Sequence, residues 1–147
     1  MALKTKIIRT GGKVEIRAIA TPGKGGGKDP CATLKFCQEI KNTHWEELSK
    51  LVRLWDDIAR DGPPANDQKF KALPGSDGLF EIKTTKLRVL CFWDDGSLII
   101  CTHGFVKKSK KTPSNELERA QRDKNRYFDE KRKKTLKHEP APRRPLR

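Results

Sequence analysis

The sequence predicts an α+β domain of two layers, an antiparallel sheet with helices packed on it, and three observations carry this prediction. Residues 43–59 repeat apolar side chains at three- and four-residue steps, as an amphipathic helix does. Residues 79–84, 87–93 and 98–106 are successive runs rich in aromatic and β-branched residues, which is typical of strands. Residues 13–19 alternate polar and apolar side chains, which indicates a half-buried strand.

The N-terminal third predicts a strand, a loop and a helix. The glycine-rich residues 21–28 lack the Gly-Lys-Ser/Thr ending of a phosphate-binding loop, so we interpret them as a plain connection. A helix is expected from Asp29, as its N-cap, to Ile40, because proline favours the first helical position. Its inward face would carry Leu34, Cys37 and Ile40.

The second helix gives the strongest helical pattern in the chain. Thr43 and Glu46 have the spacing of a capping box at its start. Trp45 and Trp55 fit the apolar stripe, so we interpret both as core residues. Residues 61–64, Asp-Gly-Pro-Pro, end the helix.

The C-terminal half predicts an antiparallel meander followed by a helix. Asp95-Gly96 is a tight-turn signal between the last two strands. A last helix should run from Thr112-Pro113 to about Lys133 and carry Leu117, Ala120, Tyr127 and Phe128 inward. The two early helices are amphipathic enough to cover one face of the sheet, so the other face, with the last helix beside it, should stay partly open.

The length of 147 residues fits one domain, which we place at residues 13–129. Residues 1–12 would be an N-terminal extension, and residues 130–147 a basic, proline-rich, disordered tail. The net charge of +14 is concentrated at the ends: residues 1–28 carry +6, residues 29–103 carry −2 and residues 104–147 carry +10. Such basic surfaces attract phosphate backbones or other anionic partners, although charge alone fits a merely soluble basic protein equally well.

Several classes of protein are disfavoured. No run approaches the roughly 18 apolar residues of a membrane span, and residues 1–12 lack the apolar core of a secretory signal, so we expect a cytoplasmic protein without a membrane partner. The four cysteines and three histidines have no zinc spacing, so we expect reduced, buried thiols, no metal and no cofactor. The sequence has no Gly-x-Ser-x-Gly elbow, and the pairs Asp56-Asp57 and Asp94-Asp95 have the pattern of solvated charge.

The unusual feature is cationic. Residues 107–111 (KKSKK) follow a strand and precede a helix start, and Lys83, Lys86 and Arg88 lie on the two strands before them. If Lys83 and Arg88 share the open face of the sheet, several cations converge there and could bind a phosphate and stabilise its transition state. Crowded like charges also lower a lysine pKa, so one lysine could act as general base. The alternative is a solvated lysine run between two elements.

These residues resemble a known family. The matching residues are similar to the phage-derived HigB-like branch of the RelE/ParE toxin superfamily: Leu87-Arg88-Val89, Gly96, the block IICTHGFVKK at residues 99–108, Lys111-Thr112-Pro113 and residues 116–120 (ELERA). Residues 73–81 (LPGSDGLFE) resemble the segment that enters that family's sheet, and the likeness covers about residues 13–128. The chain departs from the family in its longer ends and in the cysteine at position 101.

The resemblance implies a two-layer RelE-like, microbial-ribonuclease-like fold and metal-independent cleavage of mRNA by attack of its own 2′-OH on the adjacent phosphate. It implies action in the ribosomal A site, which would inhibit translation, and neutralisation by a helix-turn-helix antitoxin. By position, Arg88 would hold the scissile phosphate, Lys83 would be the base, and Lys108 and Lys111 would line the RNA path or stabilise the transition state. Tyr127 would stack a base or act as acid. Lys86, Lys107, Lys110 and His103 complete the expected RNA-binding set, although His103 also fits a packed core histidine.

Two alternatives remain open from the sequence. A ParE-like toxin would poison DNA gyrase on the same fold without cutting RNA, and charge reversal at Arg88 and the lysines would spare its toxicity. A non-catalytic nucleic-acid-binding module would depend on its basic tail, so deletion of residues 130–147 would abolish its function, whereas a toxin should survive that deletion.

Overall fold

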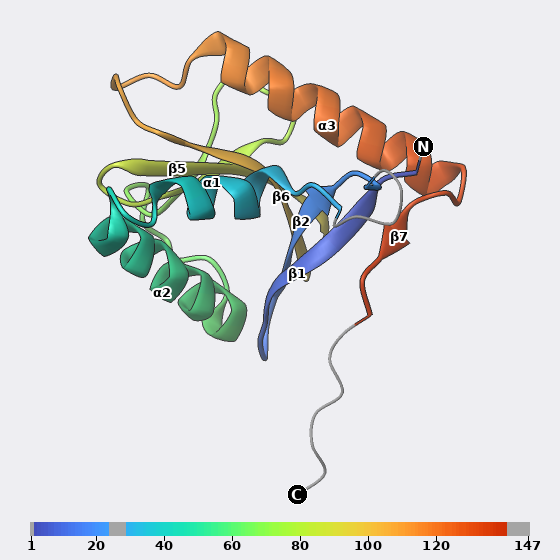
Figure 1. The fold of residues 1–147 in the computed structure, drawn as a ribbon, viewed down its shortest axis with the longest axis horizontal. Helices are drawn as coiled ribbons and strands as arrows, with labels where there is room; N and C mark the ends of the chain where they lie inside the picture. Colours follow the sequence, from blue (N-terminus) through green and yellow to red (C-terminus); the bar gives the residue numbers. More distant parts are fainter. Residues whose placement is uncertain (1, 24–28, 141–147) are drawn as a thin grey trace, which may run out of the picture.

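The computed structural model describes residues 2–23 and 29–140, which form one mixed sheet with helices on it (Figure 1). The loop expected at residues 21–28 is therefore described only to Gly23, and the expected tail only to Pro140. The elements in chain order are β1 (Lys4–Thr10), β2 (Glu15–Ala20), α1 (Ala32–Ile40), α2 (Trp45–Asp61), β3 (Phe70–Ala72), β4 (Phe80–Lys83), β5 (Leu87–Asp95), β6 (Leu98–Val106), α3 (Ser114–Arg132) and β7 (Lys137–His138).

The strands lie in the order β3-β4-β5-β6-β2-β1-β7. The predicted meander is confirmed, because β3, β4, β5 and β6 pair antiparallel in sequence. The expectation of a wholly antiparallel sheet is wrong for two strand pairs. Strand β2 pairs parallel to β6, with Glu15 opposite Leu98, and β1 pairs parallel to β7. Parallel strands need a long crossover, and here two helices and the meander connect β2 to β6.

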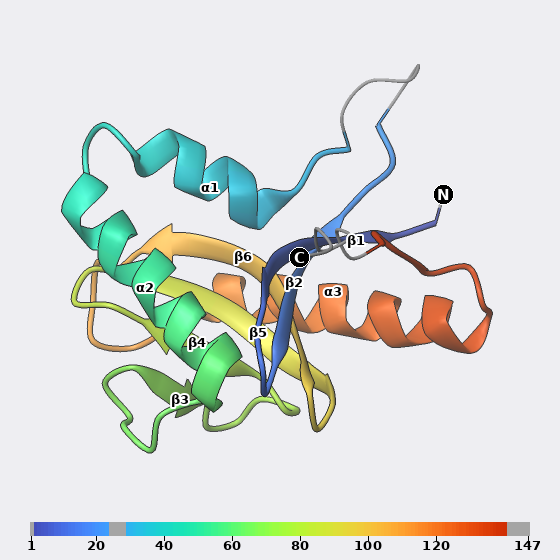
Figure 2. The same ribbon diagram turned by 90° about the horizontal axis from the view of Figure 1, so that it is seen from below.

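The helices cover both faces of the sheet, so the two-layer arrangement expected from the sequence is wrong. Helices α1 and α2 pack on one face through Phe36, Leu51, Trp55 and Ile58, while α3 packs on the other through Ala120 and Tyr127. Figures 1 and 2 show α3 on the opposite side of β5 and β6 from α1 and α2. The physical reason lies in β5 and β6, whose nearly continuous apolar runs are buried on both faces.

Both ends of the described chain join the sheet. Residues 4–10, which the sequence placed in an N-terminal extension, form β1, and Leu3 and Ile8 are buried. Residues 130–138, which the sequence placed in a disordered tail, contain the end of α3 and strand β7. The Glu130 carboxylate accepts a hydrogen bond from the Leu3 backbone N–H at 2.6 Å, so the two ends are tied to each other.

Helix α1 starts later than predicted. Its N-cap is Cys31, whereas Asp29 accepts a hydrogen bond from the Gly23 N–H and pairs with Lys4 at 3.1 Å. The buried face carries Thr33, Phe36 and Ile40. The prediction that Leu34 faces inward is wrong, because the observed face passes through the neighbouring positions and leaves Leu34 37% exposed.

Helix α2 follows its predicted stripe except at its first turn. Leu51, Trp55 and Ile58 are buried as expected. The predicted capping box does not form, since the N-cap is His44 and the Thr43 hydroxyl donates to the Ile40 carbonyl. Trp45 is 63% exposed, because it is the first residue of the helix; its interpretation as a core residue is wrong.

Two expectations about composition can be compared with the structure. Cys31, Cys91 and Cys101 are buried and Cys37 is half-buried, and all four thiols are free. Burial raises the pKa of these thiols, that of Cys37 to about 11, so they stay protonated. Within residues 2–23 and 29–140, no helix has the length and apolar character needed to cross a membrane.

Candidate functional site

The candidate site lies on the face of the sheet that carries α3, where two rows of side chains cross strands β4, β5 and β6. In the first row Glu81 lies opposite Leu90, and Leu90 lies opposite His103. In the second row Lys83 lies opposite Arg88, and Arg88 lies opposite Phe105. Directly opposite residues of an antiparallel pair point to the same face, so the register alone gathers these side chains.

The start of α3 closes over these rows. The Thr112 hydroxyl, in the loop before α3, donates to Glu81 Oε2 at 2.6 Å. His103 Nε2 lies 3.3 Å from Glu116 Oε1 in the first turn of α3. The site is thus built from three strands, the β6–α3 loop and one helix end, all of which come from residues 80–116.

Arg88 is the buried cation of the site and is 7% exposed. Its Nη1 donates to the carbonyl oxygens of Thr84 at 2.6 Å and Leu87 at 2.9 Å, and its Nε lies 3.9 Å from Glu81 Oε1. Burial lowers the pKa of Arg88, and the negative charges of Glu81 and Glu47 oppose that effect. A guanidinium stays charged even so, which makes Arg88 a fixed positive charge at the end of β4 and β5.

Lys83 lies next to that charge and is partly exposed. Partial burial lowers the pKa of Lys83, and the positive charges of Arg88, Lys71 and Lys107 lower it further against the opposing effect of Glu81. Its Nζ donates to the Asp67 carbonyl at 3.1 Å. The structure therefore brings Lys83, Arg88 and Lys107 together, as the sequence predicted.

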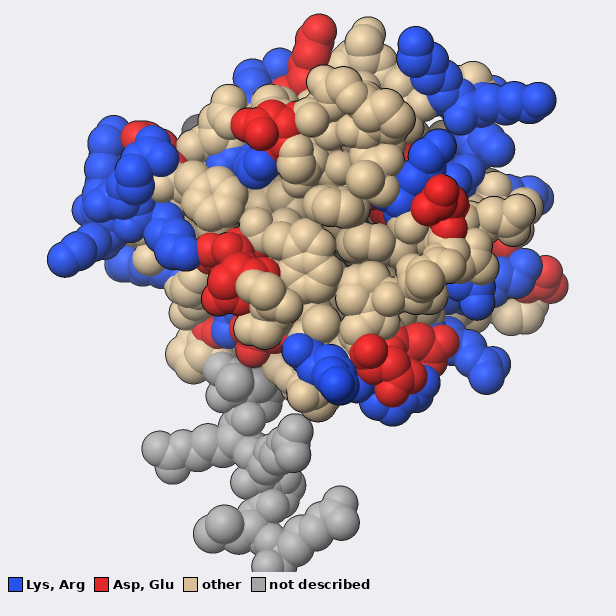
Figure 3. Space-filling model, turned by 180° about the vertical axis from the view of Figure 1, so that it is seen from behind, with Lys and Arg blue, Asp and Glu red and all other residues tan. Residues whose placement is uncertain are grey.

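The remaining lysines surround this centre with exposed charge. Lys86 is exposed in the β4–β5 turn, and its carbonyl accepts a hydrogen bond from the Lys107 N–H at 2.7 Å, which ties that turn to the end of β6. Lys108, Lys110 and Lys111 are exposed in the loop between β6 and α3. Figure 3, seen from behind, shows basic side chains gathered at both sides of this view, with the upper right group where that loop projects.

His103 lies in the site but is 1% exposed. Burial lowers its pKa to about 4, and the charge of Arg119 adds to that effect, so the ring is neutral near pH 7. Because a carboxylate only accepts, the ring proton sits on Nε2 toward Glu116, and Nδ1 lies 3.0 Å from the Thr102 hydroxyl, which also lies 3.3 Å from the Leu90 carbonyl oxygen. The structure gives His103 the environment of a packed histidine, which is the alternative left open by the sequence.

Tyr127 is not brought to the site. It is a fully buried residue of α3, and its hydroxyl donates to Asp94 Oδ2 at 2.6 Å. Burial and the Asp94 carboxylate both raise its pKa. Arg88 and Asp94 stand six residues apart on β5, which corresponds to about 20 Å along an extended strand.

Three polar residues of the site were missed from the sequence: Glu81, Thr112 and Glu116. Glu81 could have been found, because it alternates with Phe80 and Ile82 and therefore shares the face of Lys83. Thr112 and Glu116 lie in a loop and a helix start whose approach to the sheet is a tertiary contact without a local pattern. Within the described ranges, no group of three or more His, Cys, Asp or Glu side chains is placed to hold a metal ion.

One protein-family model matches the part of the chain that contains this site. Residues 38–125 match the family model described as phage derived protein Gp49-like (DUF891). The chain belongs to the Gp49-like family. The match to the Gp49-like model runs from the end of α1 to the middle of α3 and includes every residue of both rows. It confirms the sequence resemblance to RelE/HigB-like toxins at the level of the Gp49-like family. No curated protein matches the chain significantly.

In this Gp49-like protein, the cations of the site are arranged so that they could bind a phosphodiester. A fixed guanidinium, a lysine with a lowered pKa and a loop of exposed lysines together form a surface that can hold a phosphodiester. Lys83, whose pKa is lowered, can take up and release a proton beside lysines that can stabilise added negative charge. The neutral His103 and the buried Tyr127 do not contribute to that surface in this conformation.

Proposed function

We propose that this protein is the toxin of a type II toxin–antitoxin system and acts in the cytoplasm as an endoribonuclease on mRNA. The convergence of Lys83, Arg88 and Lys107 on one face of the sheet is the observation that carries the proposal. Membership of the Gp49-like family supports the toxin assignment. The HigB-type branch, action in the ribosomal A site and a helix-turn-helix antitoxin are parts of the proposal that rest on the sequence resemblance.

The proposed reaction uses the RNA's own nucleophile. Neutral Lys83 takes the proton from a ribose 2′-OH, and the 2′ oxygen then forms a bond to the adjacent phosphorus. The bond from phosphorus to the 5′ oxygen breaks, and that oxygen takes a proton from a protonated lysine of the 107–111 loop. The products are a 2′,3′-cyclic phosphate and a free 5′-OH. Arg88 and Lys107 stabilise the extra charge on the phosphate in the transition state.

The test changes Lys83, since Arg88 also holds the β4–β5 turn through two carbonyl oxygens. The wild type and Lys83→Gln are each induced briefly, and new 5′ ends are mapped on cellular mRNA. The wild type should give discrete new ends and arrest growth. Loss of a general base should slow cleavage by about 10²- to 10⁴-fold.

A matched control is Lys35→Gln, an exposed lysine on α1 on the far side of the sheet. This variant should cleave as the wild type does. Growth arrest by the wild type with intact mRNA would contradict the ribonuclease and favour a gyrase-poisoning toxin. Equal cleavage by Lys83→Gln and the wild type would remove Lys83 from the reaction.

One observation favours a second candidate, a non-catalytic nucleic-acid-binding module. Arg88 Nη1 is occupied by backbone carbonyls, and His103 and Tyr127 are buried, so the exposed cations of the β4–β5 turn and the β6–α3 loop are all lysines, suited to non-specific phosphate binding. Such a module would bind RNA in vitro and leave every bound RNA intact, which the mapping of 5′ ends and a gel assay on purified protein both detect.

A further inference from the structure

The first turn of α2 places an exposed aromatic ring near the β4–β5 turn, which carries Lys86 and joins Lys83 to Arg88. Trp45 is 63% exposed. The only other exposed large hydrophobic residue among the described residues is Leu34, at 37%. Exposing an indole to water is unfavourable, and a flat ring beside positive charge is the arrangement on which single-stranded nucleic acids stack their bases. Leu51, Leu54 and Trp55 of α2 lie in the hydrophobic core, whereas Trp45 is not among the core residues.

The ring is held at a fixed place relative to the site. Glu47 Oε1 accepts hydrogen bonds from the Thr84 hydroxyl at 2.8 Å and from the Lys86 backbone N–H at 2.6 Å. Glu47 is 7% exposed, so these bonds are shielded from water. The first turn of α2 is thereby fastened to the β4–β5 turn, which lies between Lys83 and Arg88.

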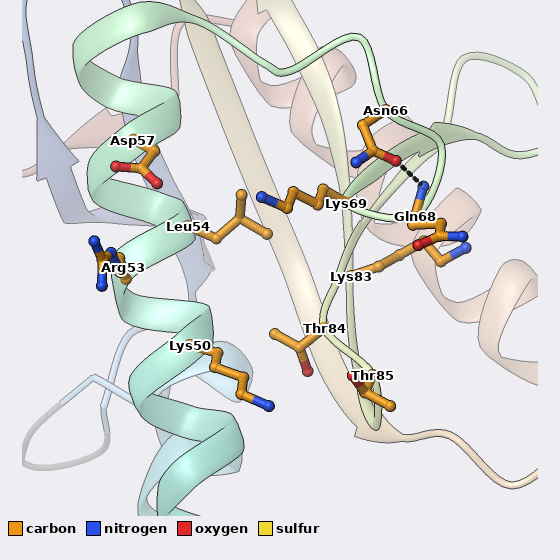
Figure 4. A pocket seen from close by; sticks show the side chains of 10 residues that line it. All are labelled: Lys50, Arg53, Leu54, Asp57, Asn66, Gln68, Lys69, Lys83, Thr84 and Thr85. Atoms are coloured by element: carbon orange, nitrogen blue, oxygen red, sulfur yellow. Dashed lines mark hydrogen bonds between the residues drawn. The ribbon is translucent and has the colours of Figure 1, made fainter.

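A hollow connects Trp45 to the turn. It has a volume of about 290 Å³ and is lined by residues 43–47 together with Lys50, Thr85 and Lys86. A second groove of about 510 Å³ adjoins it, because Lys50 and Thr85 line both. Figure 4 shows this second groove between α2 and the β4–β5 turn, with Lys50 and Lys69 reaching toward it from opposite walls.

The combined groove is cationic. Lys50, Arg53, Lys69, Lys83 and Lys86 line it. Three acidic residues also line it: Glu47 pairs with Lys50 at 3.1 Å, Asp57 pairs with Arg60 at 3.0 Å, and Glu46 is exposed to solvent, so the cations remain in excess. A chain of phosphates can follow such a groove, whereas an acidic wall would repel it and an apolar wall would not attract it.

We propose that Trp45 and this groove form a binding track for single-stranded RNA that leads to Lys83, with Trp45 stacking on an unpaired base and Lys86 and Lys50 contacting the phosphates beside it. The choice of RNA as ligand rests on the proposed function. A paired base has no free face to stack on Trp45, so the track selects single-stranded RNA over a duplex. Trp45 is a binding residue in this assignment and takes no part in the bond-breaking step.

The test measures binding separately from cleavage. The probe is a short single-stranded RNA in which every ribose is 2′-O-methylated, since such an RNA lacks the attacking hydroxyl. Binding to the full chain is followed by quenching of tryptophan fluorescence and by a gel shift. Trp45→Ala should weaken binding by about 5- to 150-fold, the range for one stacked base, and should lose most of the quenching.

Two variants serve as controls. Trp45→Phe keeps an aromatic face and should retain most of the affinity, while Leu34→Ala removes the other exposed apolar side chain and should change nothing. The duplex form of the probe should bind the wild type and Trp45→Ala equally.

The outcomes separate this inference from the proposed function. Unchanged affinity in Trp45→Ala, or weaker binding of an antitoxin with RNA binding intact, would overturn the inference and make Trp45 a protein contact. A loss of RNA affinity in Trp45→Ala would support it even if the wild type cut no unmodified RNA, and in that case the proposed nuclease alone would fail.

Discussion

Among single residues, His103 combines burial, a hydrogen-bonded ring and a depressed pKa. It lies on β6 opposite Leu90, which separates it from Glu81 of β4 in the same row of the site. Its Nε2 contacts Glu116 and its Nδ1 contacts Thr102, so the ring connects the sheet to the first turn of α3. A neutral ring makes this connection by hydrogen bonding alone, whereas a protonated ring would put a charge into an apolar layer.

The folded protein should therefore lose stability as pH falls below about 6.5. Burial lowers the pKa of His103 to about 4 in the folded state, while the unfolded chain has the ordinary value of about 6.5. The unfolded chain binds the proton more tightly, so the stabilisation is complete above about pH 6.5 and is lost toward about pH 4, with a cost of about 2 kcal/mol between pH 7 and pH 5.

Urea denaturation of the wild type and His103→Gln at pH 7 and pH 5 measures this effect. The variant has no titrating ring, so its free energy of unfolding should change by about 2 kcal/mol less between the two pH values. The same pH dependence in both proteins would show that carboxylates, and not His103, are responsible.

At the scale of the elements, the contact between α2 and the β4–β5 turn depends on the carboxylate of Glu47. Burial acts to raise the pKa of Glu47, but the hydrogen bonds from Thr84 and Lys86 and the nearby Lys50 outweigh it and lower the pKa. An ionised Glu47 therefore satisfies one hydroxyl and one backbone N–H that would otherwise be left in a poorly hydrated place.

Glu47→Ala should destabilise the fold by about 1–3 kcal/mol, because it leaves those donors without an acceptor. It should also loosen the turn that carries Lys83 and Lys86 and weaken binding of the 2′-O-methylated RNA. Glu46→Ala, one position earlier on an exposed part of the same helix, is the matched control and should stay within about 0.5 kcal/mol of the wild type. Equal stability of both variants would show that the hydrogen bonds of Glu47 with Thr84 and Lys86 do not stabilise the fold.

Some helices and strands could be predicted from local sequence patterns alone. The stripe of α2 and the alternation and turn of β5 and β6 are local, so they predicted those elements and the common face of Lys83 and Arg88. The position of α3 over the second face, the parallel joint between β2 and β6 and the approach of Thr112 to Glu81 are tertiary contacts between distant segments. A local pattern does not encode them, which is why the layer count, Thr112 and Glu116 were missed, whereas the alternation of β4 does place Glu81 on the face of Lys83.

At the scale of the whole molecule, the two ends of the described chain, β1 and β7, lie at the same edge of the sheet. Strand β7 pairs with β1 through Lys4 and Thr5, and the Thr5 hydroxyl lies 2.6 Å from His138 Nδ1. Glu130 adds its hydrogen bond to the Leu3 N–H and a pair with Arg126 at 2.9 Å. Deletion of residues 130–147 would thus remove structural contacts together with the basic charge, and its effect on activity would not isolate the tail.

Two truncations separate those effects. A chain that ends at Pro140 should keep the melting temperature of the full chain, because its described contacts are intact. A chain that ends at Asp129 loses the Glu130 and β7 contacts, worth about 2–3 kcal/mol, and should melt about 5–10 °C lower in a thermal scan. Equal melting temperatures would show that β7 contributes no stability.

The parallel pairing of β2 with β6 also determines when the protein can fold during synthesis. Residues 15–18 pair with residues 98–101, so the N-terminal hairpin has no neighbour in the sheet until most of the chain has left the ribosome. Contacts between such distant segments slow folding, since a long loop must close before the pairing stabilises it. A nascent chain therefore carries an unfinished sheet, and any activity of its central strands begins only after translation of that same chain has nearly ended.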